Sequence, residues 1–124
     1  CWHVRESHAV TSTPQDFQKY IQASLGEWSC AKPSYTRMKT AWVSDRSVCC
    51  LASGRPVVVQ VTGPSPTLPS DLGMLRFTTL EEAAEMVRKV VEDYPKQSRA
   101  ARELAETQFS VTKLIPRLMK RLGS

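Results

Sequence analysis

Residues 53–61 have the sequence SGRPVVVQV, in which a glycine and a proline precede a run of valines. Gly54 marks the end of a helix predicted over residues 45–53, because glycine readily takes the backbone conformation in which helices end. The valine run places apolar residues on both faces of one extended segment, residues 56–61. A strand of this kind is typical of a parallel sheet covered by helices on each side. We therefore predict a central parallel strand here.

Further strand signals lie on both sides of this segment. The apolar residues 41–43 predict a short strand before the helix, and Ser44 or Asp45 can cap that helix. Residues 62–72 are predicted to form a loop, because they hold Gly63 and three prolines. Residues 73–77 then predict another short strand. The order of strand, helix, strand, loop and strand is typical of a doubly wound sheet.

Helices are predicted toward both ends of the chain. The first covers residues 14 to about 24, where Thr13 can serve as the cap. Thr79 and Glu82 stand at capping-box spacing at the start of a strongly amphipathic helix. A further helix begins at Pro95 and extends toward Phe109. The last covers residues 111–122, and Pro116 should kink it or delay its start.

Together these elements predict one α/β domain, a Rossmann-like three-layer fold with a small, mainly parallel sheet. Residues 1–39 form an irregular and helical lead-in, residues 41–77 the strand-helix-strand core, and residues 79–122 the C-terminal helices. A chain of 124 residues with 41% hydrophobic and 23% charged residues suits a single core. No segment has the ~20 consecutive apolar residues of a membrane span, so we expect a cytoplasmic domain.

The net charge of +5 raises the question of an anionic partner. The excess lies at the C-terminal end, in Lys113, Arg117, Lys120 and Arg121. Such residues commonly solvate the outer side of a terminal helix, so we expect negligible nucleic-acid binding at physiological salt.

The cysteines and histidines form no recognisable metal or catalytic site. Cys49 and Cys50 are adjacent, and the other two cysteines have no metal-site spacing, so we expect reduced thiols with Cys30, Cys49 and Cys50 in or near the core. His3 and His8 have no partner at ligand spacing. We therefore predict no bound metal.

The carboxyl ends of the predicted strands are the place to look for a ligand, since open α/β sheets bind there. Ser44, Asp45, Arg46 and Ser47 lie at a helix N-terminus, where free N–H groups and the helix dipole favour phosphate. Arg46 can contact a diphosphate with two nitrogens. Ser44 and Asp45 would equally serve as an ordinary helix cap.

Four spaced motifs resemble the C-terminal, donor-binding domain of GT-B fold glycosyltransferases, in a bacterial branch like families 1 and 4. They are GEWSCAK (26–32), WVSDRS (42–47), LASGRPV (51–57) and QVTGP (60–64). The branch carries Gly-Glu-Phe-Ser, Trp-Phe-Ser-Asp-Arg-Ser, Leu-Ala-Ser-Gly-Arg-Pro-Val and Gln-Asp-Thr-Gly at these places. Trp2 and residues 14–21 also fit, so the resemblance covers nearly the whole chain.

The resemblance implies a nucleoside-diphosphate sugar as donor substrate and no other cofactor. Glu27 and Lys32 would face the donor, with the diphosphate at the start of the helix at Asp45. The last of the four motifs, with Thr62 and Gly63, would hold the sugar or a phosphate. The family's acceptor site and usual catalytic base lie in an N-terminal domain, so no catalytic residue is assigned. Cys49 replaces a glutamate of the general pattern that grips the donor ribose.

We therefore expect part of a hexosyl-transferring enzyme that binds the donor and is inactive alone. The alternatives are a non-catalytic binding or assembly module with the same fold, and a basic nucleic-acid-binding domain. Because the chain supplies only part of a GT-B half, we also expect an uncovered sheet edge. Such an edge predicts a homo-oligomer or the missing N-terminal domain as partner, with possible exchange of residues 1–39.

Overall fold

The fold is described from a computed structural model that covers residues 3–65, 68 and 71–123. The sheet has three strands in the order β1-β2-β3, namely β1 (Glu27–Ser29), β2 (Val57–Gln60) and β3 (Met74–Phe77). Both pairings are parallel, with Val57 opposite Glu27 on one side and Met74 on the other. The predicted central parallel strand is confirmed. Trp2, Pro66 and Pro69 lie outside the described residues.

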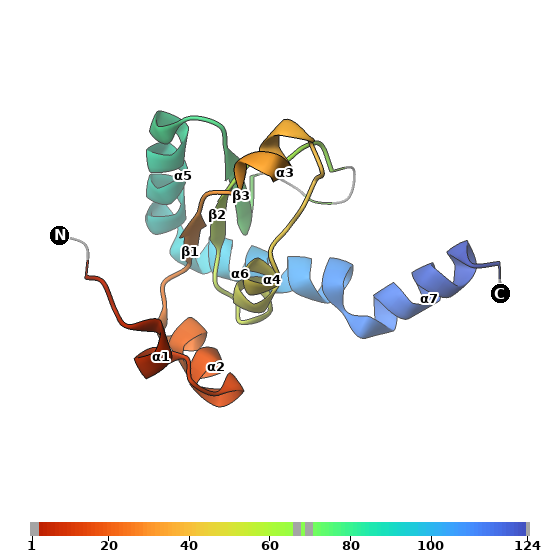
Figure 1. Ribbon diagram of the computed structural model, residues 1–124, viewed down its shortest axis with the longest axis horizontal. Coiled ribbons are helices and arrows are strands. Elements are labelled where there is room, and N and C mark those ends of the chain that lie inside the picture. The colour runs from red at the N-terminus through yellow and green to blue at the C-terminus, as the bar shows by residue number, and fades with distance from the viewer. Residues whose placement is uncertain (1–2, 66–67, 69–70, 124) are drawn as a thin grey trace.

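Helices cover both faces of this sheet (Figure 1). On one face, Val57 and Met74 share a core with α2 (Pro14–Ala23), α4 (Asp45–Ala52), α6 (Tyr94–Leu104) and the π-helix η1 (Ala105–Phe109). On the other face, Val58 and Leu75 pack with α5 (Leu80–Glu92). The structure is thus an α/β domain with a Rossmann-like, three-layer arrangement, as predicted.

The helix boundaries follow from local capping. The Thr79 hydroxyl accepts from the Glu82 N–H at 3.2 Å, and the Glu82 carboxylate accepts from the Thr79 N–H at 3.3 Å, which completes the predicted capping box of α5. Thr13 caps α2, where Pro14 occupies the first turn. Ser44 caps α4. Each cap satisfies a backbone donor that the helix itself leaves open.

The strand predicted over residues 41–43 is not formed, and the first strand comes instead from the lead-in. Ala41 has a positive φ of 56°, and its N–H donates to the carbonyl of Thr62 rather than to a sheet ladder. Trp42 stacks on Tyr35 with the ring centroids 4.5 Å apart. Residues 3–39 hold β1 and two short helices, α1 (Ser7–Val10) and α3 (Pro33–Arg37), that the sequence analysis did not predict.

The cysteines only partly follow the expectation. Cys50 is buried against the core, whereas Cys30 and Cys49 are exposed. Cys30 follows the end of β1, and Cys49 lies on the outer side of an eight-residue helix. The expectation that all three lie in or near the core is therefore wrong for Cys30 and Cys49.

The connection from β2 to β3 contains no helix or strand among its described residues. Leu68 packs against the core on the α4 and α6 side, and the Gly73 N–H donates to the Gln97 side chain at 2.8 Å. The Cβ of any other residue at position 73 would lie 2.4 Å from the Ala101 nitrogen. The crossover therefore lies against α6, and glycine permits the close approach.

At the C-terminal end, a π-helix lies between the two predicted helices. After α6, the five residues of η1 form a π-helix, and α7 (Val111–Arg121) follows with Pro116 inside it. Pro116 therefore does not delay the start of the last helix. Helix α7 extends away from the sheet in Figure 1, and residues 111–123 are all exposed. No helix in the described part of the chain is long and apolar enough to cross a membrane.

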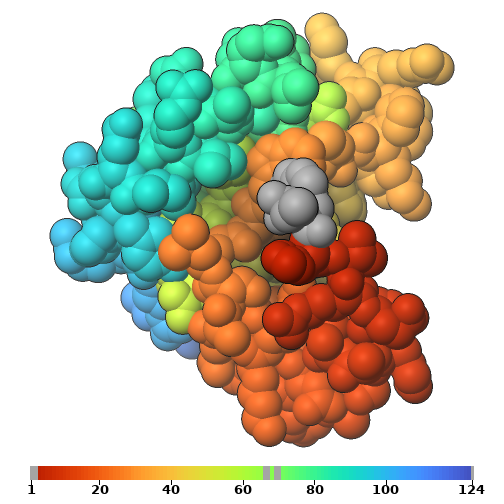
Figure 2. Space-filling view, turned by 90° about the vertical axis from the view of Figure 1, so that its left-hand side faces the viewer, coloured from red at the N-terminus to blue at the C-terminus, as the bar shows by residue number. Residues whose placement is uncertain are grey.

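A groove of about 440 Å³ lies between β1 and α5. Its lining includes Leu25 and Trp28 beside the sheet edge and Val87 and Val91 on the helix. Figure 2 shows this side of the molecule, which is hollowed between the N-terminal segment and α5. Leu25 and Val91 are each 59% exposed, so apolar side chains remain uncovered here.

Candidate functional site

Most of the predicted site residues lie at the carboxyl edge of the sheet, whereas Glu27 is the first residue of β1. Because the strands are parallel, the segments that follow β1, β2 and β3 all leave from this edge. A small pocket with an accessible volume of about 20 Å³, which we call the α4 pocket, lies there. Its lining includes Ser29, Trp42, Ser44, Ser47 and Thr62. Three predicted residues, Ser44, Ser47 and Thr62, thus come together in one pocket.

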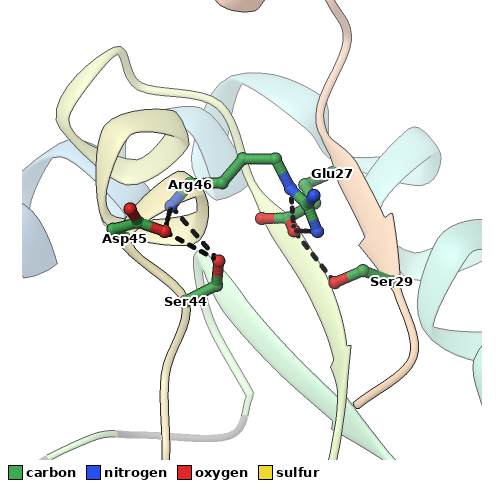
Figure 3. A network of polar contacts seen from close by, with 5 residues as sticks. All are labelled: Glu27, Ser29, Ser44, Asp45 and Arg46. Atoms are coloured by element: carbon green, nitrogen blue, oxygen red, sulfur yellow. Dashed lines mark hydrogen bonds and ion pairs between the residues drawn. The ribbon is translucent and has the colours of Figure 1, made fainter. Parts of the chain in front are cut away.

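Glu27 and Arg46 form the charged part of the site (Figure 3). Nε and Nη2 of Arg46 each lie 2.8 Å from Oε1 of Glu27. The Ser29 hydroxyl donates to the same oxygen at 2.9 Å. The Glu27 side chain is only 6% exposed, whereas that of Arg46 is 52% exposed. A buried carboxylate therefore holds an accessible guanidinium at the first turn of α4.

The second carboxylate oxygen of Glu27 is less well satisfied. Oε2 is buried and has no hydrogen-bond partner among the described residues. Burying a charged oxygen without a donor costs free energy, so the burial of the Glu27 carboxylate depends strongly on its ion pair with Arg46.

The charge of Glu27 also acts on Cys50 in α4. Burial first, and the Glu27 carboxylate second, raise the pKa of the Cys50 thiol to about 11.

The side chains of Ser44 and Asp45 both accept a hydrogen bond from the same backbone N–H group. The Arg46 N–H donates to the Ser44 hydroxyl at 3.2 Å and to Oδ1 of Asp45 at 2.9 Å. That N–H is therefore satisfied within the chain, as in an ordinary helix cap. The exposed Arg46 side chain, rather than the Arg46 N–H, is the group at this helix start that can reach a ligand.

Thr62 and Gly63 hold the segment that precedes α4. The Thr62 hydroxyl donates to the carbonyl of Trp42 at 2.8 Å, and its own carbonyl accepts from Ala41 at 3.0 Å. Gly63 has φ +135°, and a Cβ there would lie 2.6 Å from the carbonyl oxygen of Lys39. Both residues therefore fix the 39–42 segment, and their predicted contacts to a sugar or phosphate stay predictions.

Lys32 does not join the network. It is exposed and precedes α3, and no hydrogen bond or ion pair links it to the other predicted residues within the described chain. The structure thus joins Glu27, Ser44, Asp45 and Arg46 by direct contacts. Gly63 lines a different, larger pocket.

The sequence analysis missed two groups at this edge. The Gln60 side chain lines the α4 pocket, and its oxygen accepts from the Ala31 N–H at 3.1 Å, which joins the ends of β1 and β2. Arg76 lies in β3 between buried apolar neighbours. A charged residue inside the predicted strand over residues 73–77 was a signal that could have marked it.

The described residues contain no group of three or more His, Cys, Asp or Glu side chains that could hold a metal ion.

Comparison with known proteins gives no matching family model, no matching curated protein and no matching solved structure. The resemblance to GT-B glycosyltransferases therefore stays a prediction.

Proposed function

We propose that this domain binds the nucleoside diphosphate of a nucleotide-sugar donor, as the donor half of a GT-B type glycosyltransferase. The observation that carries the proposal is the buried Glu27 carboxylate that fixes Arg46 at the first turn of α4, beside a pocket lined by hydroxyl groups. A guanidinium held in one orientation loses little freedom when it binds a phosphate. The domain is proposed to bind and not to catalyse by itself.

Trp42, which lines the pocket, and Arg46, Asp45 and Tyr35, which lie beside it, offer a role for each part of a nucleotide. Arg46 would contact the diphosphate and stabilise the negative charge that develops on it when the sugar leaves. Asp45 is exposed and can accept from ribose hydroxyls, in place of the glutamate that the family pattern has where this chain has Cys49. The Tyr35 and Trp42 rings, stacked at 4.5 Å, offer a flat surface at the pocket for the base.

The α4 pocket is small compared with a nucleotide. Its accessible volume of about 20 Å³ has room for about one water molecule, so the pocket itself would hold only a small part of the ligand. We therefore expect weak binding, with the remainder of the ligand covered by a second domain in a complete enzyme.

The test is a titration of the chain with UDP and GDP, followed by NMR chemical shifts or calorimetry. We expect saturable binding at millimolar concentration or below and shifts at residues 44–47. Arg46→Ala should weaken binding about tenfold or more, because it removes a charge-assisted contact. Arg88→Ala, which removes an exposed arginine from α5, is the matched control and should bind as the wild type does.

Two results would overturn the proposal. One is no nucleoside diphosphate binding at millimolar concentration, which would favour a binding or assembly module with this fold. The other is binding that Arg46→Ala leaves unchanged, which would move the ligand away from α4.

A further inference from the structure

Arg76 is a charged residue in an otherwise buried strand. It pairs with Val59 of the central strand, and its neighbours Leu75 and Phe77 are 0% and 4% exposed. Alternation along β3 places Arg76 on the same face as Met74, the face covered by α4 and α6. Its position near the end of β3 brings the guanidinium to the carboxyl edge of the sheet.

The guanidinium of Arg76 is poorly satisfied by the described chain. Its Nη1 donates to the Gly63 carbonyl at 3.4 Å, whereas Nε and Nη2 are buried without a hydrogen-bond partner among the described residues. Burial lowers the pKa of this group, yet an arginine stays charged at neutral pH. A buried cation without an anion costs free energy unless a ligand compensates it.

Two other arginines near the sheet have more acceptors than Arg76. Arg46 has the Glu27 carboxylate at 2.8 Å. Arg55 has no carboxylate, and its Nε is also buried without a partner among the described residues, but it donates to the Tyr94 hydroxyl at 2.9 Å and to the Gln22 carbonyl. Arg76 differs because it has one long hydrogen bond and two buried nitrogens without an acceptor among the described residues. An anion beside it would supply both the acceptors and the counter-charge.

An open pocket of about 630 Å³ is lined in part by Arg76, and we call it the Arg76 pocket. Its lining includes Lys39, Thr36, Ser65 and Thr78 together with Arg76, and none of its lining residues is acidic. The nearby Glu82 carboxylate accepts from the Thr78 N–H at 2.7 Å and so serves the cap of α5. Two cations and several hydroxyls thus share one pocket.

We propose that the Arg76 pocket binds a phosphate group, with Arg76 and Lys39 supplying the positive charge. A phosphate dianion fits better than a carboxylate, because its charge matches two cations and a further oxygen can accept from the Thr78 hydroxyl, which also lines the pocket. The two proposed sites can be tested separately, because Arg46 does not line the Arg76 pocket, although Gln60 lines both pockets. The phosphate is either free or part of a larger molecule.

The test measures phosphate binding by NMR at constant ionic strength and pH 7.5, with potassium chloride as the reference salt. Inorganic phosphate, glucose 1-phosphate and UDP are titrated separately. We expect saturable shifts of the Gly63 and Thr78 amides and of the Arg76 Nε–H, a group with no hydrogen-bond partner among the described residues. Arg76→Gln and Lys39→Gln should each weaken binding about tenfold. Arg88→Gln, which removes an exposed arginine of α5 that lines neither pocket, is the control and should bind phosphate as the wild type does.

The three probes separate the sources of the phosphate. Binding of inorganic phosphate that depends on Arg76 supports a site for the free ion. Binding of glucose 1-phosphate or UDP alone, again dependent on Arg76, supports a site for an attached phosphate. The proposal is overturned if none of the probes binds at millimolar concentration, or if Arg76→Gln and Lys39→Gln leave binding unchanged. Loss of UDP binding in Arg46→Gln alone would concern the donor site and not this one.

A stability measurement covers the case in which a variant folds poorly. Phosphate should raise the melting temperature of the wild type relative to chloride, and this increase should disappear in Arg76→Gln and Arg76→Lys. Equal increases in the wild type and in both variants would overturn the proposal in the same way.

Discussion

Arg46 contacts one oxygen of Glu27 through two nitrogens, since Nε and Nη2 each lie 2.8 Å from Oε1. The contact joins the first turn of α4 to β1, two elements that do not follow each other directly in the chain. It also supplies the counter-charge of a carboxylate side chain that is 6% exposed. The pair therefore stabilises the fold and also positions Arg46 in the proposed site. Replacing Arg46 and replacing Glu27 should change the free energy of unfolding by different amounts.

Arg46→Ala should lower the free energy of unfolding by about 1–2 kcal/mol, because it leaves the Glu27 carboxylate buried and without its cation. The loss stays below that of a fully buried pair, since Arg46 is half-exposed and screened by solvent. Adding Glu27→Gln to Arg46→Ala should recover part of the loss, because an amide needs no counter-charge. Urea unfolding at constant m-value gives these differences. Additive losses in the double variant would contradict this account.

Gly63→Ala should destabilise the fold by about 2 kcal/mol or more, because the new Cβ would lie 2.6 Å from the Lys39 carbonyl oxygen at φ +135°. Gly54→Ala is the matched control. Gly54 also has a positive φ, of +66°, but its nearest contact is the movable Ser98 hydroxyl at 3.4 Å. It should lose only about 1 kcal/mol. Thermal or urea unfolding compares the two, and equal losses would show that the contact with Lys39 is unimportant.

Local signals predicted most of the fold. The valine run of β2, the capping box at Thr79 and the cap at Ser44 each depend on neighbours in the sequence, and all three are confirmed. The strand β1 was missed because its three residues form a strand only by pairing with Val57–Gln60, far away in the chain. The apolar run at residues 41–43 was misleading, because Trp42 stacks on Tyr35 instead of joining the sheet.

The candidate site was predictable to a similar extent. Helix-start residues such as Ser44 and Arg46 carry a local signature, and the resemblance added Glu27. The ion pair between Glu27 and Arg46 and the uncompensated guanidinium of Arg76 arise from burial and from contacts between distant segments. Neither can be derived from spacing along the sequence, because the sequence alone does not say which charges lose contact with water.

The Cys50 thiol should react slowly at pH 8, where a pKa of about 11 leaves it almost fully protonated. The exposed Cys30 and Cys49 should be alkylated first. Iodoacetamide labelling followed by mass spectrometry separates the sites. Labelling of Cys50 as fast as that of Cys30 and Cys49 in the folded chain would contradict the burial of this thiol.

The same pKa predicts a loss of stability at high pH. The folded thiol keeps its proton up to about pH 11, whereas the unfolded thiol loses it near its ordinary value of 9.0. The stabilising contribution is thus fully present below pH 9 and is lost as the pH rises from 9 to about 11. The free energy of unfolding of the wild type should fall more steeply over this range than that of Cys50→Ala. Parallel pH profiles would contradict the prediction.

The uncovered groove between β1 and α5 should make the chain associate with a second copy. The segment of residues 27–29 pairs with β2 of its own chain, so no exchange of the N-terminal segment is needed to complete the central strand. Within the described residues, apolar side chains beside β1 stay partly exposed, Trp28 at 43% and Val91 at 59%, and so offer a surface for a second copy. Light scattering over a concentration series should therefore show a dimer or larger species.

Val91→Glu should shift this equilibrium to the monomer, because association would bury a charge in an apolar groove. The side chain is exposed in the single chain, so the variant should fold normally. Leu118→Glu, on the exposed face of α7 and 53% exposed in the wild type, is the matched control and should associate as the wild type does. If Leu118→Glu alone gives monomers, the chains meet through α7 instead of the groove. A wild-type chain that stays monomeric at high concentration would show that the groove needs no second copy.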